Sequence, residues 1–225
     1  METPTALWSF ALVVGLLTIT PGLDTALILR TAALGRRREA WGVVLGIQTG
    51  TLVWGALSSL GVSALLTASH TAYDVLRVAG AAYLLWMGSR MLWGSLRRRA
   101  GDVAEPGGAT DDAAADAGSV LGLRRGGGLR SGLRRGLTTN LLNPKVGVFY
   151  VAVLPQFIPA HAPHFAMGMA LTSIHVLEGL LWSGVLVAFA GVLRGWLRRP
   201  VARRVLDRVT GVVIVGFGLR LALGD

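Results

Sequence analysis

Long apolar runs alternate with short arginine-rich connections along most of the chain. A straight helix needs about 20 apolar residues to cross the hydrocarbon core of a bilayer. Six segments approach or exceed that length, and they are residues 7–34, 41–66, 75–96, 137–158, 165–193 and 206–223. The pattern predicts an all-α polytopic membrane protein with six transmembrane helices.

The first and fourth of these segments are each interrupted at a proline, at residues 20–24 (TPGLD) and 143–145 (NPK). A proline removes a backbone donor and clashes with the preceding turn, so the freed polar groups need partners in protein or water. Asp24 and Lys145 place opposite charges beside the breaks, and a central Asp or Lys costs roughly 2.5–3.5 kcal/mol on insertion. Two broken helices carrying such charges are typical of a transporter's binding site.

Composition agrees with a membrane protein. With 52% hydrophobic residues, 15% charged residues and a mean hydropathy of +0.57, the chain is more apolar than ordinary soluble domains. It contains no cysteine, which excludes disulfides, zinc–cysteine sites, iron–sulfur clusters and cysteine nucleophiles. The net charge of +10 comes from arginine clusters between apolar segments, so it indicates membrane orientation and predicts no nucleic-acid partner.

The arginine clusters also predict the topology. They follow the first, third and fifth spans, whereas the other connections and both chain ends have almost no Lys or Arg. The positive-inside rule therefore places the clustered loops in the cytoplasm and both termini outside. The two halves, residues 1–99 and 129–225, then have three spans each. They are inserted into the membrane in opposite directions, as in an inverted repeat. Residues 100–128 are rich in Gly, Ala and Asp and lack aromatic residues, which predicts a disordered cytoplasmic linker.

Glycines in the second span form a stripe. Gly42, Gly46 and Gly50 recur every four residues and share one helix face, where another backbone can approach closely. This face can serve packing within one chain or contact within a homodimer.

Several motifs together resemble the LysE/RhtB family of amino-acid exporters. They are the TPGLD break at 20–24, the glycine-rich second span, GAAYL at 80–84, LLNPK at 141–145 and LPQF at 154–157. The resemblance implies six spans in two inverted three-helix repeats in the bacterial cytoplasmic (inner) membrane, exporting amino acids or their derivatives with the proton-motive force. The family usually has a second proline where this chain has Leu23, and Glu178 lies outside the family pattern.

The residues beside the breaks can be assigned roles. Gly22 lets the backbone open next to Pro21 and expose amide and carbonyl groups to a zwitterion. Asn143 offers a donor and an acceptor beside Pro144. Lys145, the only lysine of the chain, can neutralise Asp24 or attract a substrate carboxylate. Two alternatives remain: a static ion pair joining the halves, and a lysine that reaches the cytoplasmic interface.

Two further polar residues lie within spans. Glu178 suits a proton carrier, although it can equally be a packing residue hydrogen-bonded to His175 one turn earlier. Gln48 either lines the same cavity or bonds to a neighbouring helix. The predicted substrate-binding and coupling residues are thus Thr20, Pro21, Gly22, Asp24, Gln48, Asn143, Pro144, Lys145 and Glu178.

The sequence therefore predicts a secondary exporter of amino acids or related zwitterions that uses proton antiport in the lipid bilayer. It predicts no cofactor and no bound metal, because His161 and His164 alone are not a ligand set. No nucleophile–base spacing indicates an enzyme. The alternatives left open are an exporter of divalent metal cations and a membrane-embedded enzyme or scaffold.

Overall fold

The computed structural model describes residues 3–68, 70–97, 128–159, 162–197 and 199–223, and within these ranges every element is helical. The all-α class is therefore confirmed for the described chain. The elements are α1 (Thr3–Ile19), α2 (Leu23–Ala33), α3 (Arg37–Ala68), α4 (His70–Arg97), α6 (Leu129–Leu141), α7 (Pro144–Val148), the π-helical η1 (Phe149–Val153), the 3₁₀ turn η2 (Leu154–Phe157), α8 (His164–Ala188), α9 (Ala190–Leu197) and α10 (Pro200–Leu223). The predicted linker 100–128 lies outside the described residues except for Gly128.

Length and hydropathy identify fewer spans than the six expected. Two described helices are long and apolar enough to cross a membrane, over Arg37–Gly61 and His164–Ala188. The pair Pro4–Ile19 and Leu23–Ala33, bent by 52° at its break, makes a third if it counts as one span. The fourth predicted span is divided among α6, α7, η1 and η2, so it presents no continuous apolar helix. The six-span inverted repeat stays a prediction.

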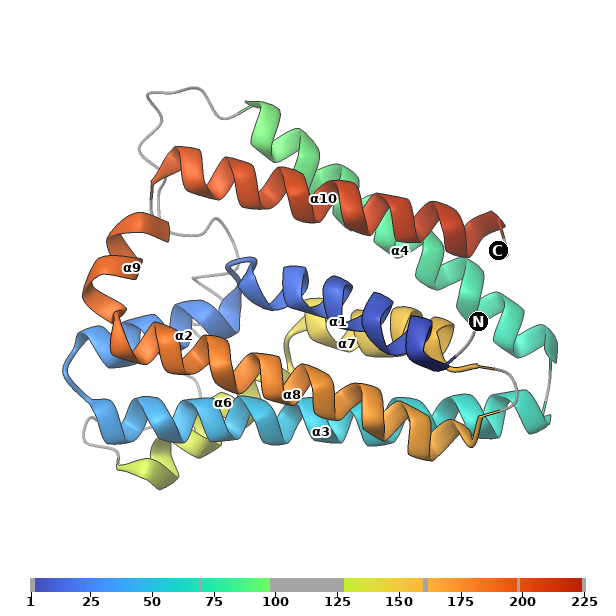
Figure 1. Ribbon diagram of the computed structural model, residues 1–225, viewed down its shortest axis with the longest axis horizontal. Coiled ribbons are helices and arrows are strands. Elements are labelled where there is room, and N and C mark those ends of the chain that lie inside the picture. The colour runs from blue at the N-terminus through green and yellow to red at the C-terminus, as the bar shows by residue number, and fades with distance from the viewer. Residues whose placement is uncertain (1–2, 69, 98–127, 160–161, 198, 224–225) are drawn as a thin grey trace.

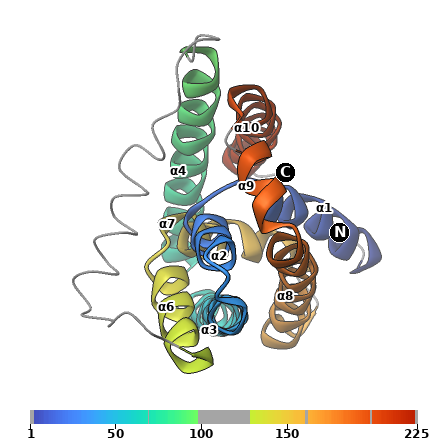
Figure 2. The ribbon, with the colours of Figure 1, turned by 90° about the vertical axis from the view of Figure 1, so that its left-hand side faces the viewer.

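The helices form two groups, with α1 and α7 between them. α4 packs along α10, and α3 packs along both α6 and α8. Figure 1 shows α1 and α7 between the α4–α10 pair and the α3–α8 pair. Figure 2 shows α4 and α10 on one side of the group formed by α2, α3, α6 and α8. Of the interrupted segments, α1 and α7 therefore lie between the two groups, whereas α2 and α6 belong to the group around α3.

The two ends of the molecule differ in which helices begin there. In Figure 1 the starts of α3 and α6 and the whole of α9 lie at the left-hand end. The end of α3 and the start of α8 lie at the right-hand end, together with the start of α1 and the end of α10. The first turns of α3 and α6 carry arginines, whereas α1 carries no charged residue. The arginines in the first turns of α3 and α6 thus lie at the same end of the molecule.

A helix begins earlier than expected in the second half. α6 starts at Leu129 instead of 137, so Arg130, Arg134 and Arg135 lie on a helix that precedes the predicted span. α6 is stabilised by its packing on α3, where Arg135 Nη1 donates to Glu39 Oε1 over 2.9 Å. The predicted fifth span likewise ends early, at Ala188, and continues as the separate helix α9. Apolar length alone did not indicate either boundary.

Glycines on both α3 and α6 bring the two backbones together. A Cβ at Gly42 or Gly46 would overlap backbone carbonyl groups of Leu129 or Leu133 on α6. Reciprocally, a Cβ at Gly132 or Gly136 would overlap carbonyl groups on α3. The stripe expected from the sequence therefore serves packing within the chain, with a matching stripe on α6 that the sequence analysis did not identify.

Filling this interface should destabilise the protein. Gly46→Ala places a methyl group against the α6 backbone, which cannot rotate away as a side chain can, and we expect a loss of about 1–3 kcal/mol. Thermal unfolding of the detergent-purified protein measures the effect. Gly61→Ala, at an α3 glycine with open space around it, is the matched control and should unfold like the parent. Equal unfolding temperatures for both variants would contradict the close packing.

Candidate functional site

The first break leaves a backbone carbonyl without its usual donor. α1 ends at Ile19 and α2 begins at Leu23. In a continuous helix the N–H of residue 21 would donate to the carbonyl of Leu17, but Pro21 has no N–H. Lys145 supplies the missing donor, because its Nζ donates to Leu17 O over 2.9 Å and to Thr20 O over 3.2 Å. The ammonium group thus caps the broken end of α1.

The second break positions this lysine. Asn143 is the N-cap of α7, and its buried side-chain oxygen accepts from the backbone N–H of Lys145 over 3.1 Å. Pro144 stands in the first turn, where its missing N–H costs no helical hydrogen bond. The short helix that follows directs Lys145 toward the first break. The second break therefore positions the donor that satisfies two backbone carbonyls at the first break.

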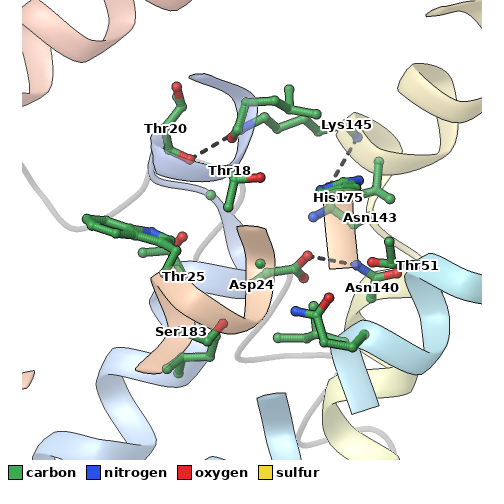
Figure 3. A pocket seen from close by; sticks show the side chains of 18 of the residues that line it. Thr18, Thr20, Asp24, Thr25, Thr51, Asn140, Asn143, Lys145, His175 and Ser183 are labelled. Atoms are coloured by element: carbon green, nitrogen blue, oxygen red, sulfur yellow. Dashed lines mark hydrogen bonds between the residues drawn. The ribbon is translucent and has the colours of Figure 1, made fainter. Parts of the chain in front are cut away.

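Asp24 lies in the first turn of α2, beside the same opening. Its Oδ2 accepts from Asn140 Nδ2 over 2.9 Å, while its other carboxylate oxygen is buried without a hydrogen-bond partner among the described residues. Asn140 stands in the last turn of α6, and its side chain fills the space opposite Gly50 of α3. Figure 3 shows Asp24 and Asn140 pointing toward one another. The packing of α6 on α3 therefore holds the partner of this carboxylate.

The static Asp24–Lys145 ion pair considered from the sequence is not formed. Lys145 Nζ is bound to two backbone carbonyls, and Asp24 is bound to Asn140. Both side chains nevertheless line one cavity of about 70 Å³ at the meeting point of α1, α2, α3, α6, α7 and α8 (Figure 3). The two opposite charges thus face a common space without neutralising one another directly.

Unpartnered polar atoms surround this cavity. Six of the described side chains have a buried nitrogen or oxygen without a hydrogen-bond partner, and four of these side chains line the cavity. The four atoms are Thr18 Oγ1, Asp24 Oδ1, Asn140 Oδ1 and Trp182 Nε1. An unsatisfied buried polar group costs about 1–3 kcal/mol, so these groups favour a polar ligand or water in the cavity.

Six of the nine predicted site residues line the cavity: Thr20, Gly22, Asp24, Gln48, Asn143 and Lys145. Pro21 lies at the break but not in the lining, and Pro144 lines a second, largely apolar cavity of about 540 Å³ together with Trp54 and Tyr83. Glu178 lies outside the polar cavity and faces Gly15 of α1. His175 is bound to Tyr150 Oη over 2.9 Å, so the His175–Glu178 hydrogen bond is not formed.

Several lining residues were missed. Thr18, Asn140, His175 and Trp182 line the cavity but were not among the predicted site residues. Asn140 had a signal in the sequence, because it ends a Thr-Thr-Asn run one turn before Asn143. Trp182 had none, since an indole within an apolar span is indistinguishable from a packing residue. Within the described residues no cluster of three or more His, Asp or Glu side chains could hold a metal ion.

Comparison with known proteins places this chain in a family. The family model described as "LysE type translocator" matches residues 13–225. The chain is 30% identical to a threonine efflux protein of Escherichia coli K12 and 29% identical to a leucine efflux protein of Klebsiella pneumoniae. The first alignment covers 91% of each chain, and the second covers 91% of this chain and 88% of the relative.

A third relative, the uncharacterized membrane protein YrhP of Bacillus subtilis, is 26% identical over 97% of this chain and 99% of its own length. No solved structure matches the chain. The match to the family model extends over both broken helices and almost the whole length, which confirms the resemblance noted from the motifs. The chain is therefore a cell-membrane transport protein, not an enzyme, and belongs to the LysE type translocator family.

Proposed function

We propose that this protein exports amino acids or related small zwitterionic solutes across the bacterial inner membrane by proton antiport. The observation that carries the proposal is the polar cavity, which presents one carboxylate and one ammonium group, Asp24 and Lys145, on separate partners. A zwitterion carries the complementary pair of charges. The leucine and threonine efflux relatives support the same substrate class.

The unpartnered atoms suggest how the substrate binds. Asp24 Oδ1 and Asn140 Oδ1 are both hydrogen-bond acceptors, so they suit the substrate ammonium. The unpartnered Trp182 Nε1 is a donor, and Lys145 Nζ has a third N–H beyond its two bonds to carbonyls, so both suit the substrate carboxylate. The N-terminus of α2 has no side-chain cap, and its partial positive charge lies beside Lys145, near the N-cap Gly22, as well as beside Asp24 in the first turn. The cavity thus has an acceptor set and a donor set for one small zwitterion.

Lys145 also suggests how binding is coupled to movement. Its ammonium holds the broken end of α1, in the first half of the chain, to α7, in the second half. A substrate carboxylate that attracts Lys145 would weaken this link and let the halves move relative to one another. We propose alternating access of two inverted three-helix repeats with both termini outside, which agrees with the gathering of basic helix starts at one end. A homodimer remains a prediction.

The topology can be tested with single cysteines, because the natural sequence has none to give background labelling. Leu34→Cys lies between α2 and α3, and Pro163→Cys lies before α8; both positions are exposed. A membrane-impermeant thiol reagent applied to intact cells should label position 163 and leave position 34 unlabelled until the cells are opened. Labelling of position 34 from outside would contradict the proposed orientation.

Transport itself is tested by counterflow into proteoliposomes. Labelled amino acids are supplied to vesicles loaded with the same unlabelled compound, and uptake is then repeated with an imposed pH gradient. Saturable counterflow of at least one amino acid, and its accumulation by the gradient, is the expected result. Movement of divalent cations in place of amino acids would overturn the proposed substrate class. Counterflow without any response to the pH gradient would overturn proton antiport.

A further inference from the structure

Glu178 is a carboxyl group within the membrane-crossing part of α8 that the polar cavity does not use. α8 spans His164–Ala188, so Glu178 lies well inside it. Its Oε2 atom is buried without a hydrogen-bond partner among the described residues. The atom lies against α1 at Gly15, where a Cβ would stand 3.2 Å from it. The absence of a side chain at Gly15 therefore makes room for the carboxyl group.

The seam between α1 and α8 connects Glu178 with the cavity. Trp182 stands one turn after Glu178 on α8, and Thr18 stands one turn after Gly15 on α1. Both residues line the cavity, and each has a buried polar atom without a partner, Trp182 Nε1 and Thr18 Oγ1. Polar groups therefore line the seam between α1 and α8, from the Glu178 carboxyl group outside the cavity to Thr18 and Trp182 in the cavity wall.

No described ionisable side chain neutralises Glu178. α8 packs mainly against α1, α2, α3, α9 and η2, and it also contacts η1 through His175 and Tyr150. Neither α1 nor η2 contains an ionisable side chain. Three ionisable side chains of α2, α3 and α8 are bound elsewhere: Asp24 to Asn140, Glu39 to Arg36 and Arg135, and His175 to Tyr150. The arginines of α2 and α3, namely Arg30, Arg37 and Arg38, are exposed, and the side chain of Arg194 on α9 is outside those that the structure describes. Lys145, across the cavity, is bound to the end of α1. A carboxyl group so placed in a span indicates a functional site.

We propose that Glu178 is the proton-binding site of the transport cycle, separate from the substrate site and joined to it by the α1–α8 seam. The inference rests on the proposed antiport. On the outer side a proton from water forms an O–H bond at the Glu178 carboxylate. On the inner side that bond breaks and the proton passes to cytoplasmic water, while the substrate moves outward. Charge and proton are conserved because the carboxyl group returns ionised at the end of each cycle.

Glu178→Gln separates the two sites experimentally. It keeps the size of the side chain but cannot release a proton, and it leaves every cavity-lining residue in place. We expect accumulation driven by a pH gradient to be lost, whereas counterflow at equal pH, which needs no net proton movement, continues. Glu178→Asp should restore part of that accumulation. Leu177→Gln, which puts the same amide on the exposed neighbouring position of α8, is the matched control and should accumulate substrate like the parent.

Wild-type gradient-driven accumulation in Glu178→Gln would overturn the inference, and so would a joint loss of counterflow and accumulation in a folded protein. A second measurement does not need a substrate. Infrared titration of purified protein in lipid should show a carboxyl signal that changes with pH in the parent and is missing from Glu178→Gln. Unchanged spectra would refute proton binding at Glu178 even if no amino acid is transported, whereas absence of transport with a missing signal would refute only the proposed function.

Discussion

Asp24→Asn is expected to abolish amino-acid export while the protein still inserts and purifies as one species. Asparagine keeps the shape of the side chain and can still accept from Asn140, so the fold loses little. The substrate ammonium, however, loses its only described carboxylate in the cavity. Truncating one member of a buried, hydrogen-bonded charge pair costs about 2–5 kcal/mol, or roughly 30- to 4,000-fold in affinity. Counterflow in proteoliposomes measures the loss.

A matched pair on α3 controls for this result. Thr51 is buried in the cavity lining, whereas Thr49, two residues earlier, is exposed and bonds its own helix backbone at Leu45. Thr49→Val should therefore transport like the parent, and Thr51→Val should transport less well. Size-exclusion profiles and unfolding temperatures separate loss of function from loss of fold. Wild-type flux through Asp24→Asn would remove Asp24 from the substrate site.

The location of the candidate site could be predicted from the sequence because its physical origin is local. A proline in an apolar run must leave a carbonyl unpaired, whatever surrounds it. Charged residues beside two such breaks are costly to place in the membrane, so they indicate a functional site there. Pro21 and Pro144 gave this information directly, and Asp24 and Lys145 do share the cavity. The family could be recognised on the same residues.

The partners within the site could not be predicted, because they depend on the relative positions of helices far apart in sequence. Nothing local indicates that Lys145 binds the carbonyl of Leu17, or that Asn140 binds Asp24. The contact between Asn140 and Asp24 depends on α6. The arginines of α6 suggested that its first residues were part of the connection before the fourth span. The glycines of α6, however, fit this helix closely to α3. Periodicity of apolar residues does not reveal a helix that is held by backbone contact.

Lys145→Met is expected to reduce both stability and transport. Methionine keeps the approximate length of the side chain but has no N–H group, so Leu17 O and Thr20 O lose their donor at the break. Each buried carbonyl left unpaired costs about 1–3 kcal/mol. Thermal unfolding in detergent reports the loss of stability, and counterflow reports the loss of the substrate's cationic partner. Lys145→Arg, which keeps the charge and the donors, should unfold closer to the parent than Lys145→Met does.

A second substitution shows whether the lysine acts through the proline break. Pro21→Ala restores an N–H at residue 21, which can donate to Leu17 O and remove part of the need for Lys145. Adding Pro21→Ala to Lys145→Met should therefore recover more stability than Pro21→Ala adds to the parent, a coupling that a double-mutant cycle measures. Transport should not recover, because the cavity still lacks its ammonium group. Independent, additive effects of the two substitutions would show that Lys145 stabilises the protein by some contact other than the cap on α1.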